Sequence, residues 1–253
     1  AEFDLITKRF NSTDREFEAI GNVHVYRVSG SKHLFPLKAY WLARKLHKKK
    51  PYTHLWAIMA NWAGFAALFF KHHFPNVKYI LTLQEGDPIS YIKHKVWFVY
   101  PLFKKIFTKA DVIQTISNYL ADWAREMGVQ GRVEVIPNGV NYEEFAKPTF
   151  SAHGQEGNSR EKSVWLITTS RLVKKNGVGD VIEALKFLPE NVKFKIVGIG
   201  PLESKLRVKA QKMGERVEFV GLVSPDQIPK QLHSAGMFLR PSLSERMGNS
   251  FVE

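Results

Sequence analysis

The 253-residue sequence contains no cysteine. This absence excludes a disulfide scaffold, a cysteine-ligated zinc site and a thiol nucleophile. Long apolar runs are missing too: the most apolar stretch, Leu55 to Phe70, is interrupted by Asn61 and is shorter than the roughly 20 residues of a bilayer-spanning helix. The amino-terminal residues lack the apolar core of a signal peptide. We therefore expect a soluble protein of a reducing compartment.

Carboxylates are scarce in one segment. Residues 32–109 hold fourteen lysines and arginines but only Glu85 and Asp87 as acids, so this segment carries +12 of the formal net charge of +13. The same segment is rich in aromatic residues. Charge concentrated in this way indicates an anionic partner: a bilayer surface, a nucleic acid or a phosphorylated substrate.

What the sequence does contain is a regular alternation of short apolar runs with longer amphipathic stretches. The runs predict strands at 3–7, 23–28, 54–59, 79–83, 112–116, 133–136, 164–170, 192–197, 217–220 and 236–240. The longer stretches predict helices at 36–50, 61–73, 91–107, 118–127, 177–187, 201–213 and 225–233. This alternation predicts an α/β protein whose parallel sheets are covered on both faces. The polar stretch 148–163 predicts a linker between a unit at 1–147 and a unit at 164–253.

Two cations follow one of the predicted strands. Arg171 and Lys175 come directly after the strand 164–170. Ligands of open α/β sheets bind beyond the carboxyl ends of the strands, and two cations there can neutralise a diphosphate. The alternative is an exposed basic loop.

A glycine-rich turn follows another predicted strand. Gly198-Ile199-Gly200-Pro201 ends the strand 192–197 and opens a helix, which is the context of a phosphate site at a helix N-terminus. The third glycine of a dinucleotide fingerprint is replaced by Glu203, so the pattern does not fit NAD. A tight turn with no ligand is the alternative interpretation.

The carboxylates near the end of the sequence form a spaced pair. Glu245 and Glu253 are eight residues apart, and the backbone N–H groups of 248–250 between them could bind an anion. Two solvated glutamates are the alternative. The nine histidines have no metal-binding spacing, and Glu85 with Asp87 is the one acidic pair that could hold a metal–nucleotide complex. We expect no metal.

Taken in order, four motifs resemble those of the family 4 glycosyltransferases. They are TTSRLVKKNGV (168–178), KIVGIGPLESKL (195–206), VEFVGLVS (217–224) and FLRPSLSERMGNSFVE (238–253). Residues 109–128 and 133–145 are similar to that family's passage out of its first domain. The resemblance implies the GT-B fold, with two Rossmann-like parallel-sheet domains. It also implies a hexosyltransferase that transfers a sugar from a nucleotide-diphosphate donor, with retention and without a metal or another cofactor.

The resemblance also assigns site residues. It gives catalytic roles to Glu245, Arg171 and Lys175. It gives donor-binding roles to Gly198, Gly200, Pro201, Val220, Met247, Gly248, Asn249, Ser250, Phe251 and Glu253. Three positions depart from the family pattern: Asn176 replaces a usual lysine, Arg246 a usual glycine, and Gln84-Glu85-Gly86-Asp87 a frequent histidine.

The same resemblance implies that the family's first strand would precede Ala1 and that helices would follow Glu253. We expect an internal part of a longer protein that is inactive by itself. The expected partners are a nucleotide sugar, a glycan or lipid-linked acceptor, and an anionic membrane surface bound through residues 32–109. The expected location is cytoplasmic, peripheral to the inner face of the membrane.

Three alternatives stay open at this point. A nucleic-acid-binding module would use the basic segment, but no recognition motif supports it, and we expect no nucleic acid. The others are a GT-B sugar epimerase and a non-catalytic binding protein.

Overall fold

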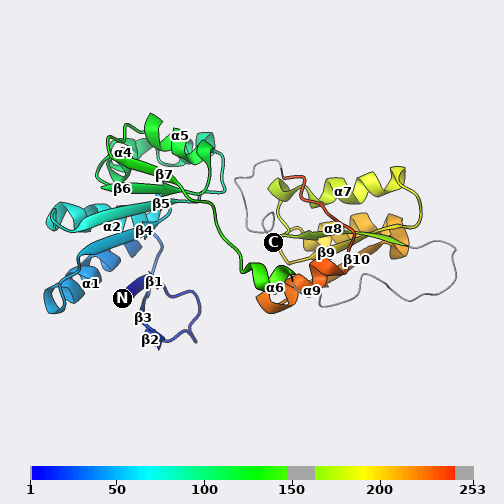
Figure 1. The fold of residues 1–253 in the computed structure, drawn as a ribbon, viewed down its shortest axis with the longest axis horizontal. Coiled ribbons are helices and arrows are strands. Elements are labelled where there is room, and N and C mark those ends of the chain that lie inside the picture. Colours follow the sequence, from blue (N-terminus) through cyan, green and yellow to red (C-terminus); the bar gives the residue numbers. More distant parts are fainter. Residues whose placement is uncertain (1, 147–162, 243–253) are drawn as a thin grey trace. The chain divides into compact units, whose positions relative to one another are not determined.

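Alternating strands and helices build two units, Ala1–Pro137 and Asn138–Glu253 (Figure 1). The computed structural model describes residues 2–146 and 163–242. The first unit ends before the boundary expected at 147, because helix α6 (Tyr142–Ala146) belongs to the second unit. There the Phe145 carbonyl oxygen lies 2.7 Å from His233 Nε2. Apart from Ser163, the expected linker lies outside the described residues.

The larger sheet of the first unit is parallel. Its strands are β4 (His54–Ile58), β5 (Lys78–Leu83), β6 (Val112–Thr115) and β7 (Arg132–Val135), and they pair in that order. Each connection between neighbouring strands contains helical chain, as parallel pairing requires. The carboxyl ends of all four strands therefore lie at one edge.

The helices of the first unit follow the expected pattern with one correction. They are α1 (Phe35–Lys49), α2 (Trp62–His73), α3 (Ile89–Lys95), α4 (Tyr100–Thr108) and α5 (Asn118–Glu126). The single helix expected at 91–107 is wrong, because a 3-10 turn at Trp97–Val99 divides it. Pro101 lies in the first turn of α4, where its missing N–H costs nothing.

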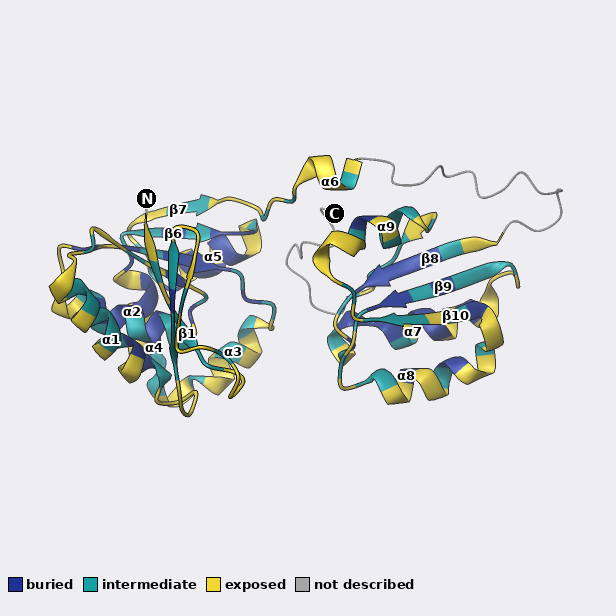
Figure 2. Ribbon diagram, turned by 90° about the horizontal axis from the view of Figure 1, so that it is seen from below, coloured by how far each residue is buried: buried dark blue, intermediate teal, exposed yellow. Residues whose placement is uncertain are grey.

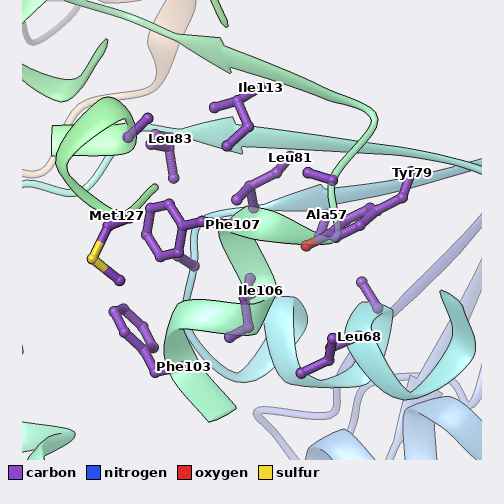
Figure 3. Packing of buried hydrophobic residues seen from close by; sticks show 14 of the residues in the cluster. Ala57, Leu68, Tyr79, Leu81, Leu83, Phe103, Ile106, Phe107, Ile113 and Met127 are labelled. Atoms are coloured by element: carbon purple, nitrogen blue, oxygen red, sulfur yellow. The ribbon is translucent and has the colours of Figure 1, made fainter. Parts of the chain in front are cut away.

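One face of this sheet carries the core (Figure 3). Tyr79, Leu81 and Leu83 alternate along β5 onto that face and are completely buried. They belong to one cluster with the aromatic rings of α2, α4 and α5, in which Phe107 and Trp123 stack edge to face at 4.9 Å. Burial of these apolar side chains stabilises the sheet in spite of the many lysines of this segment.

The opposite face of the same sheet is more open. Trp56 and Ile58 of β4 are each about half exposed there. The indole N–H of Trp56 donates to the Thr82 hydroxyl at 2.8 Å, and that hydroxyl donates to the Gln114 side-chain oxygen at 3.0 Å. A line of polar contacts thus crosses β4, β5 and β6.

A second sheet in the first unit was not expected. Strands β1 (Phe3–Lys8), β3 (Val23–Val28) and β2 (Phe17–Ile20) pair in that order, and β2 runs antiparallel to β3. The sequence analysis missed β2, which is joined to β3 by the two-residue turn Gly21-Asn22.

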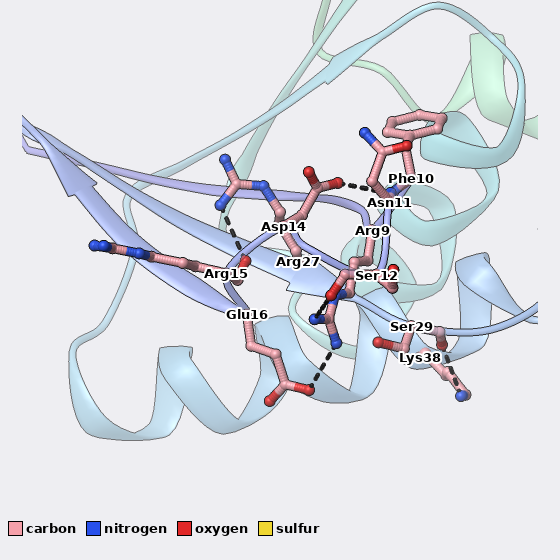
Figure 4. A network of polar contacts seen from close by, with 10 residues as sticks. All are labelled: Arg9, Phe10, Asn11, Ser12, Asp14, Arg15, Glu16, Arg27, Ser29 and Lys38. Atoms are coloured by element: carbon pink, nitrogen blue, oxygen red, sulfur yellow. Dashed lines mark hydrogen bonds and ion pairs between the residues drawn. The ribbon is translucent and has the colours of Figure 1, made fainter.

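A polar network closes the loop between β1 and β2 (Figure 4). One carboxylate oxygen of Asp14 accepts hydrogen bonds from the backbone N–H groups of Phe10 and Asn11. Arg27 donates to the Arg15 carbonyl at 3.0 Å and to Glu18 at 2.7 Å. The loop is therefore fixed to β3 by charge-assisted hydrogen bonds.

The second unit contains one parallel sheet. Its strands pair in the order β10 (Val217–Gly221), β9 (Val192–Val197), β8 (Val164–Thr169) and β11 (Met237–Phe238). Figure 2 shows α7 (Val178–Ala184) and α8 (Glu203–Ala210) on one face and α9 (Ile228–His233) on the other. Two parallel-sheet units of this kind confirm the expected α/β, Rossmann-like fold class.

The aromatic residues of the basic segment divide into two groups. Phe65, Phe70, Phe103 and Phe107 are core residues. Five others are exposed: Trp41 on α1, Trp56 on β4, Tyr91 on α3, and Trp97 and Phe98 in the turn before α4. None of the helices in residues 2–146 and 163–242 combines the length and the apolar character needed to cross a membrane.

Candidate functional site

A cavity of about 460 Å³ opens at the carboxyl ends of the strands in the second unit. Its lining comes from the loops after β8, β9 and β10 and from the start of α9. These residues are Thr169, Ser170, Arg171, Val197, Gly198, Ile199, Gly200, Leu222, Val223 and Ile228. The cavity thus lies where open α/β sheets bind their ligands.

Main-chain hydrogen bonds connect the three loops around the cavity. Ser170 N donates to Val197 O at 2.9 Å, and Leu172 N donates to Ile199 O at 3.0 Å. In the third loop, Gly221 O accepts from Gly198 N at 2.7 Å. The cavity wall is therefore a hydrogen-bonded unit rather than three independent loops.

Gly198 and Gly200 permit this close packing. Gly198 has φ of +131°, and a Cβ there would overlap the Ser170 carbonyl oxygen. A Cβ on Gly200 would lie 2.5 Å from the Leu172 carbonyl oxygen. The two glycines therefore have a packing role, and they also leave backbone exposed to the cavity that they line.

Asn176 fixes the backbone of Arg171 in the loop after β8. Arg171 is exposed at the cavity rim, and Lys175 lies in a 3-10 turn at Lys174–Asn176. Asn176 is buried, and its amide nitrogen donates to the Arg171 carbonyl at 2.7 Å. The side chain that departs from the family pattern thus orders the backbone of Arg171.

Hydroxyl groups add polar capacity to the cavity wall. Thr169 is 8% exposed, and its Oγ1 and the Oγ of Ser170 are buried without a hydrogen-bond partner among the described residues. Buried hydroxyls ordinarily have partners, so these two retain unused hydrogen-bonding capacity next to the cavity. Together with Arg171 they suit a phosphate, whereas Leu222 and Val223 give an apolar wall for a flat ring.

The structure brings together part of the expected site. Arg171, Gly198 and Gly200 line the cavity, Pro201 follows Gly200 in the turn before α8, and Val220 is in β10. Lys175, in the neighbouring 3-10 turn, is not part of the cavity lining. All assigned roles stay predictions. The other expected residues lie outside the described residues. They are Glu245, Met247, Gly248, Asn249, Ser250, Phe251 and Glu253.

Sequence reasoning gave no role to several cavity residues, among them Thr169, Ser170 and Ile228. Thr169 and Ser170 end a predicted strand, so the rule that ligands bind at carboxyl ends could have identified them. Ile228 begins a short helix, and no sequence signal marks it.

The acidic pair considered for a metal is separated. Glu85 is buried, and its carboxylate accepts a hydrogen bond from Ala60 N at the start of α2, whereas Asp87 is exposed. Glu85 therefore fixes the turn between β4 and α2. Among the described residues, no group of three or more histidines and carboxylates is placed to hold a metal ion.

Family models match both halves of the chain. A glycosyl transferase 4-like domain model matches residues 1–139, and a model described as glycosyl transferases group 1 matches residues 150–253. These matches meet close to the boundary between the two units.

Curated relatives and solved structures agree with these models. The chain is 27% identical to "Putative colanic acid biosynthesis glycosyltransferase WcaL" of Salmonella typhimurium, over 67% of this chain and 41% of that protein. It is 26% identical to the alpha-monoglucosyldiacylglycerol synthase of Acholeplasma laidlawii, over 49% of this chain and 33% of that protein. The chain thus spans less than half the length of these relatives.

Among solved structures, Anabaena HepE in complex with UDP and glucose matches with a TM-score of 0.65 and 16% identity, over 87% of this chain and 61% of that one. OtsA without ligand matches with a TM-score of 0.72 and 10% identity, over 96% and 78%. These likenesses confirm the fold. Because the glycosyl transferase 4-like model alone spans more than half of the chain, this protein belongs to the family 4 glycosyltransferases, which have the GT-B fold.

Proposed function

We propose that the protein transfers a sugar from a nucleoside-diphosphate donor to a lipid-linked or cell-envelope glycan, with retention of the anomeric configuration. The bond between the anomeric carbon and the donor phosphate breaks, and the nucleoside diphosphate leaves with the electron pair. A bond from the anomeric carbon to an acceptor hydroxyl oxygen forms, and the hydroxyl proton is released. Family membership and the relatives' names support this reaction class.

We propose that the cavity of the second unit binds the nucleotide-sugar donor. Its apolar wall at Leu222 and Val223 suits a nucleobase. The hydroxyls of Thr169 and Ser170, which have no partner within residues 2–146 and 163–242, suit phosphate or sugar oxygens. Arg171 and Lys175 supply the positive charge that stabilises a departing diphosphate. With these cations in place, we propose that no metal ion is needed.

The acceptor side of the proposal rests on the basic segment of the first unit, residues 32–109. Trp97 and Phe98 are 72% and 69% exposed, and lysines flank them on α3 and α4. Exposed aromatic rings beside cations are typical of protein surfaces that lie in the membrane interface. We propose that residues 32–109 bind an anionic, cytoplasm-facing membrane surface where the acceptor is presented.

Donor binding tests the proposal directly. Titration of the protein with UDP-, GDP- and ADP-sugars in the presence of a chelator should show saturable binding of at least one, by calorimetry or by a rise in the unfolding temperature. Arg171→Ala or Lys175→Ala should weaken that binding by about 10-fold or more, because each removes a charged hydrogen bond to phosphate. Lys174→Ala, an exposed neighbour in the same turn, is the matched control and should bind as the wild type does.

Failure to bind any of these sugars would contradict the proposal. Product analysis with a bound donor separates the related reactions: a new glycoside indicates transfer, whereas an isomerised donor indicates an epimerase.

A further inference from the structure

Arg240 lies at the same sheet edge as the cavity but outside every role assigned so far. Strand β11 pairs with β8 through Met237 and Phe238, and Leu239 N donates to Ile167 O at 2.8 Å. The ladder therefore continues past the strand, and its register places Arg240 level with Thr169 at the carboxyl end of β8.

The guanidinium of Arg240 contacts the cavity wall. Its Nη1 lies 3.5 Å from the Thr169 carbonyl oxygen, and its Nε lies 3.4 Å from Ser242 Oγ. The residue is half-buried, and Thr169 itself lines the cavity. Arg240 is thus the next side chain beyond Thr169 along the carboxyl edge of the sheet.

The segment that carries Arg240 also touches the basic turn. A Cβ on Gly177 would overlap the Pro241 carbonyl oxygen, so Pro241 packs directly on the residue that ends the turn containing Lys175. Two chain segments therefore bring Arg171, Lys175 and Arg240 to one edge of the sheet. Arg171 lines the cavity, and no carboxylate does so among the residues that the structure describes.

Strand order indicates which part of a ligand Arg240 would meet. The sheet runs β10-β9-β8-β11, so the apolar wall after β10 and the Arg240 side chain after β11 lie at opposite ends of the edge. If a nucleobase rests against Leu222 and Val223, the carboxyl edge of the sheet leads from it past Gly198 toward β8 and β11, where the phosphates would lie. The phosphate farthest from the base would then lie nearest Arg240.

We propose that Arg240 is a further binding residue, which contacts the terminal phosphate of a nucleoside diphosphate. The inference rests on the proposed function, because it needs a nucleotide in the cavity. A guanidinium suits the task, since its planar fork can bind two phosphate oxygens at once.

The test compares diphosphates with monophosphates. Binding of UDP, GDP and ADP and of UMP, GMP and AMP is measured by calorimetry for the wild type, Arg240→Ala and Arg240→Lys. Arg240→Ala should weaken the preferred diphosphate by about 10-fold and change its monophosphate by less than about 2-fold, since the lost bond is to the terminal phosphate. Arg240→Lys keeps the charge without the fork and should weaken the diphosphate by about 3-fold.

Controls separate the possible failures. Arg207→Gln removes an exposed arginine of α8 and should bind like the wild type. Equal losses for diphosphate and monophosphate, or no loss with either variant, would overturn the inference. A wild-type protein that binds no diphosphate would instead contradict the proposed function. If Arg240→Ala does not fold, Arg240→Lys decides the question alone.

Discussion

His47, in the last turn of α1, is held as a neutral hydrogen-bond acceptor. Its Nδ1 lies 2.9 Å from the backbone N–H of Tyr52, so that nitrogen carries no proton. Its ring packs on Phe70 and Phe74, with centroid distances of 5.3 and 4.3 Å. Burial lowers the pKa of His47 below its ordinary value, because the charged imidazolium is desolvated.

This arrangement predicts a loss of stability in mild acid. As the pH falls, His47 takes up a proton near pH 6.5 in the unfolded chain, and only at a lower pH in the folded chain. The neutral ring therefore contributes to the free energy of unfolding above pH ~6.5, and this contribution is lost as the pH falls through the lower pKa of the folded state. His47→Asn keeps an acceptor near Tyr52 N without a titrating ring, and should flatten the pH dependence of the free energy of unfolding below pH ~6.5. Denaturant unfolding between pH 7 and 5 measures it. The exposed His72→Asn is the control, and an unchanged slope in His47→Asn would refute the assignment.

At the same scale, the sequence identified one cation that lines the cavity, Arg171, but not how its backbone is held. Arg171 was identifiable because it follows an apolar strand, and that position has a general meaning in parallel sheets. The hydrogen bond from Asn176 to the Arg171 carbonyl depends on a backbone turn that no pattern specifies. Arg240 was equally hidden, because its register against β8 is a tertiary property.

Among the elements, α2 and α4 are fitted together through one glycine. A Cβ on Gly64 of α2 would lie 2.8 Å from Ile106 Cγ2 of α4. Ile106 is completely buried and cannot move aside. Glycine has a lower helix propensity than alanine, but at this position it allows α2 and α4 to pack closely.

Gly64→Ala should lower the free energy of unfolding by about 1–2 kcal/mol, since overpacking outweighs the gain of up to about 1 kcal/mol in helix propensity. Ile106→Leu moves the branch away from Cβ and should remove most of that cost in the double variant. The coupling is measured by a double-mutant cycle in denaturant unfolding. Gly179→Ala in α7 meets only ordinary contacts, the nearest at 3.4 Å, and should leave stability unchanged or raise it by up to about 1 kcal/mol. A stabilising Gly64→Ala would contradict the packing.

Helices and strands with a clear hydrophobic pattern were predictable from the sequence, whereas breaks and short strands were not. The core strand β5 was located within a residue of its observed bounds, because a buried parallel strand is an apolar run. The helix expected at 91–107 failed at Trp97–Val99, since its apolar periodicity continues through the break. Strand β2 has only four residues and is too short to give a signal without its partner β3.

Across the whole chain, charge and exposed aromatic rings coincide in the first unit. Lys95 on α3 and Lys104 and Lys105 on α4 are exposed near Trp97 and Phe98. Each cation near an anionic bilayer contributes about 1 kcal/mol, an attraction screened beyond about 10 Å at 0.1 M salt. The rings contribute a term that salt does not weaken.

Vesicle binding should separate these two contributions. Lys95→Gln, Lys104→Gln and Lys105→Gln combined in one variant should reduce partitioning onto anionic vesicles about 100-fold at low salt and much less at high salt. The double variant Trp97→Ser, Phe98→Ser should reduce partitioning at both low and high salt. Co-sedimentation measures partitioning.

Two changes in the second unit serve as controls. Gln at positions 205 and 212 matches the lysine changes, and Phe187→Ser matches the loss of an exposed ring. Neither should alter partitioning. Equal binding to neutral and anionic vesicles would refute the electrostatic part of the proposal.

The hydrogen bonds that join the loops after β8, β9 and β10 have a thermodynamic consequence. Loop amides usually exchange with solvent quickly, but those of Ser170, Leu172 and Gly198 are bonded to neighbouring loops and can exchange only when the wall opens. They should be protected from deuterium exchange even without a ligand. A nucleotide entering such a wall has little backbone to order, so most of its binding energy is retained as affinity instead of being spent on folding the site.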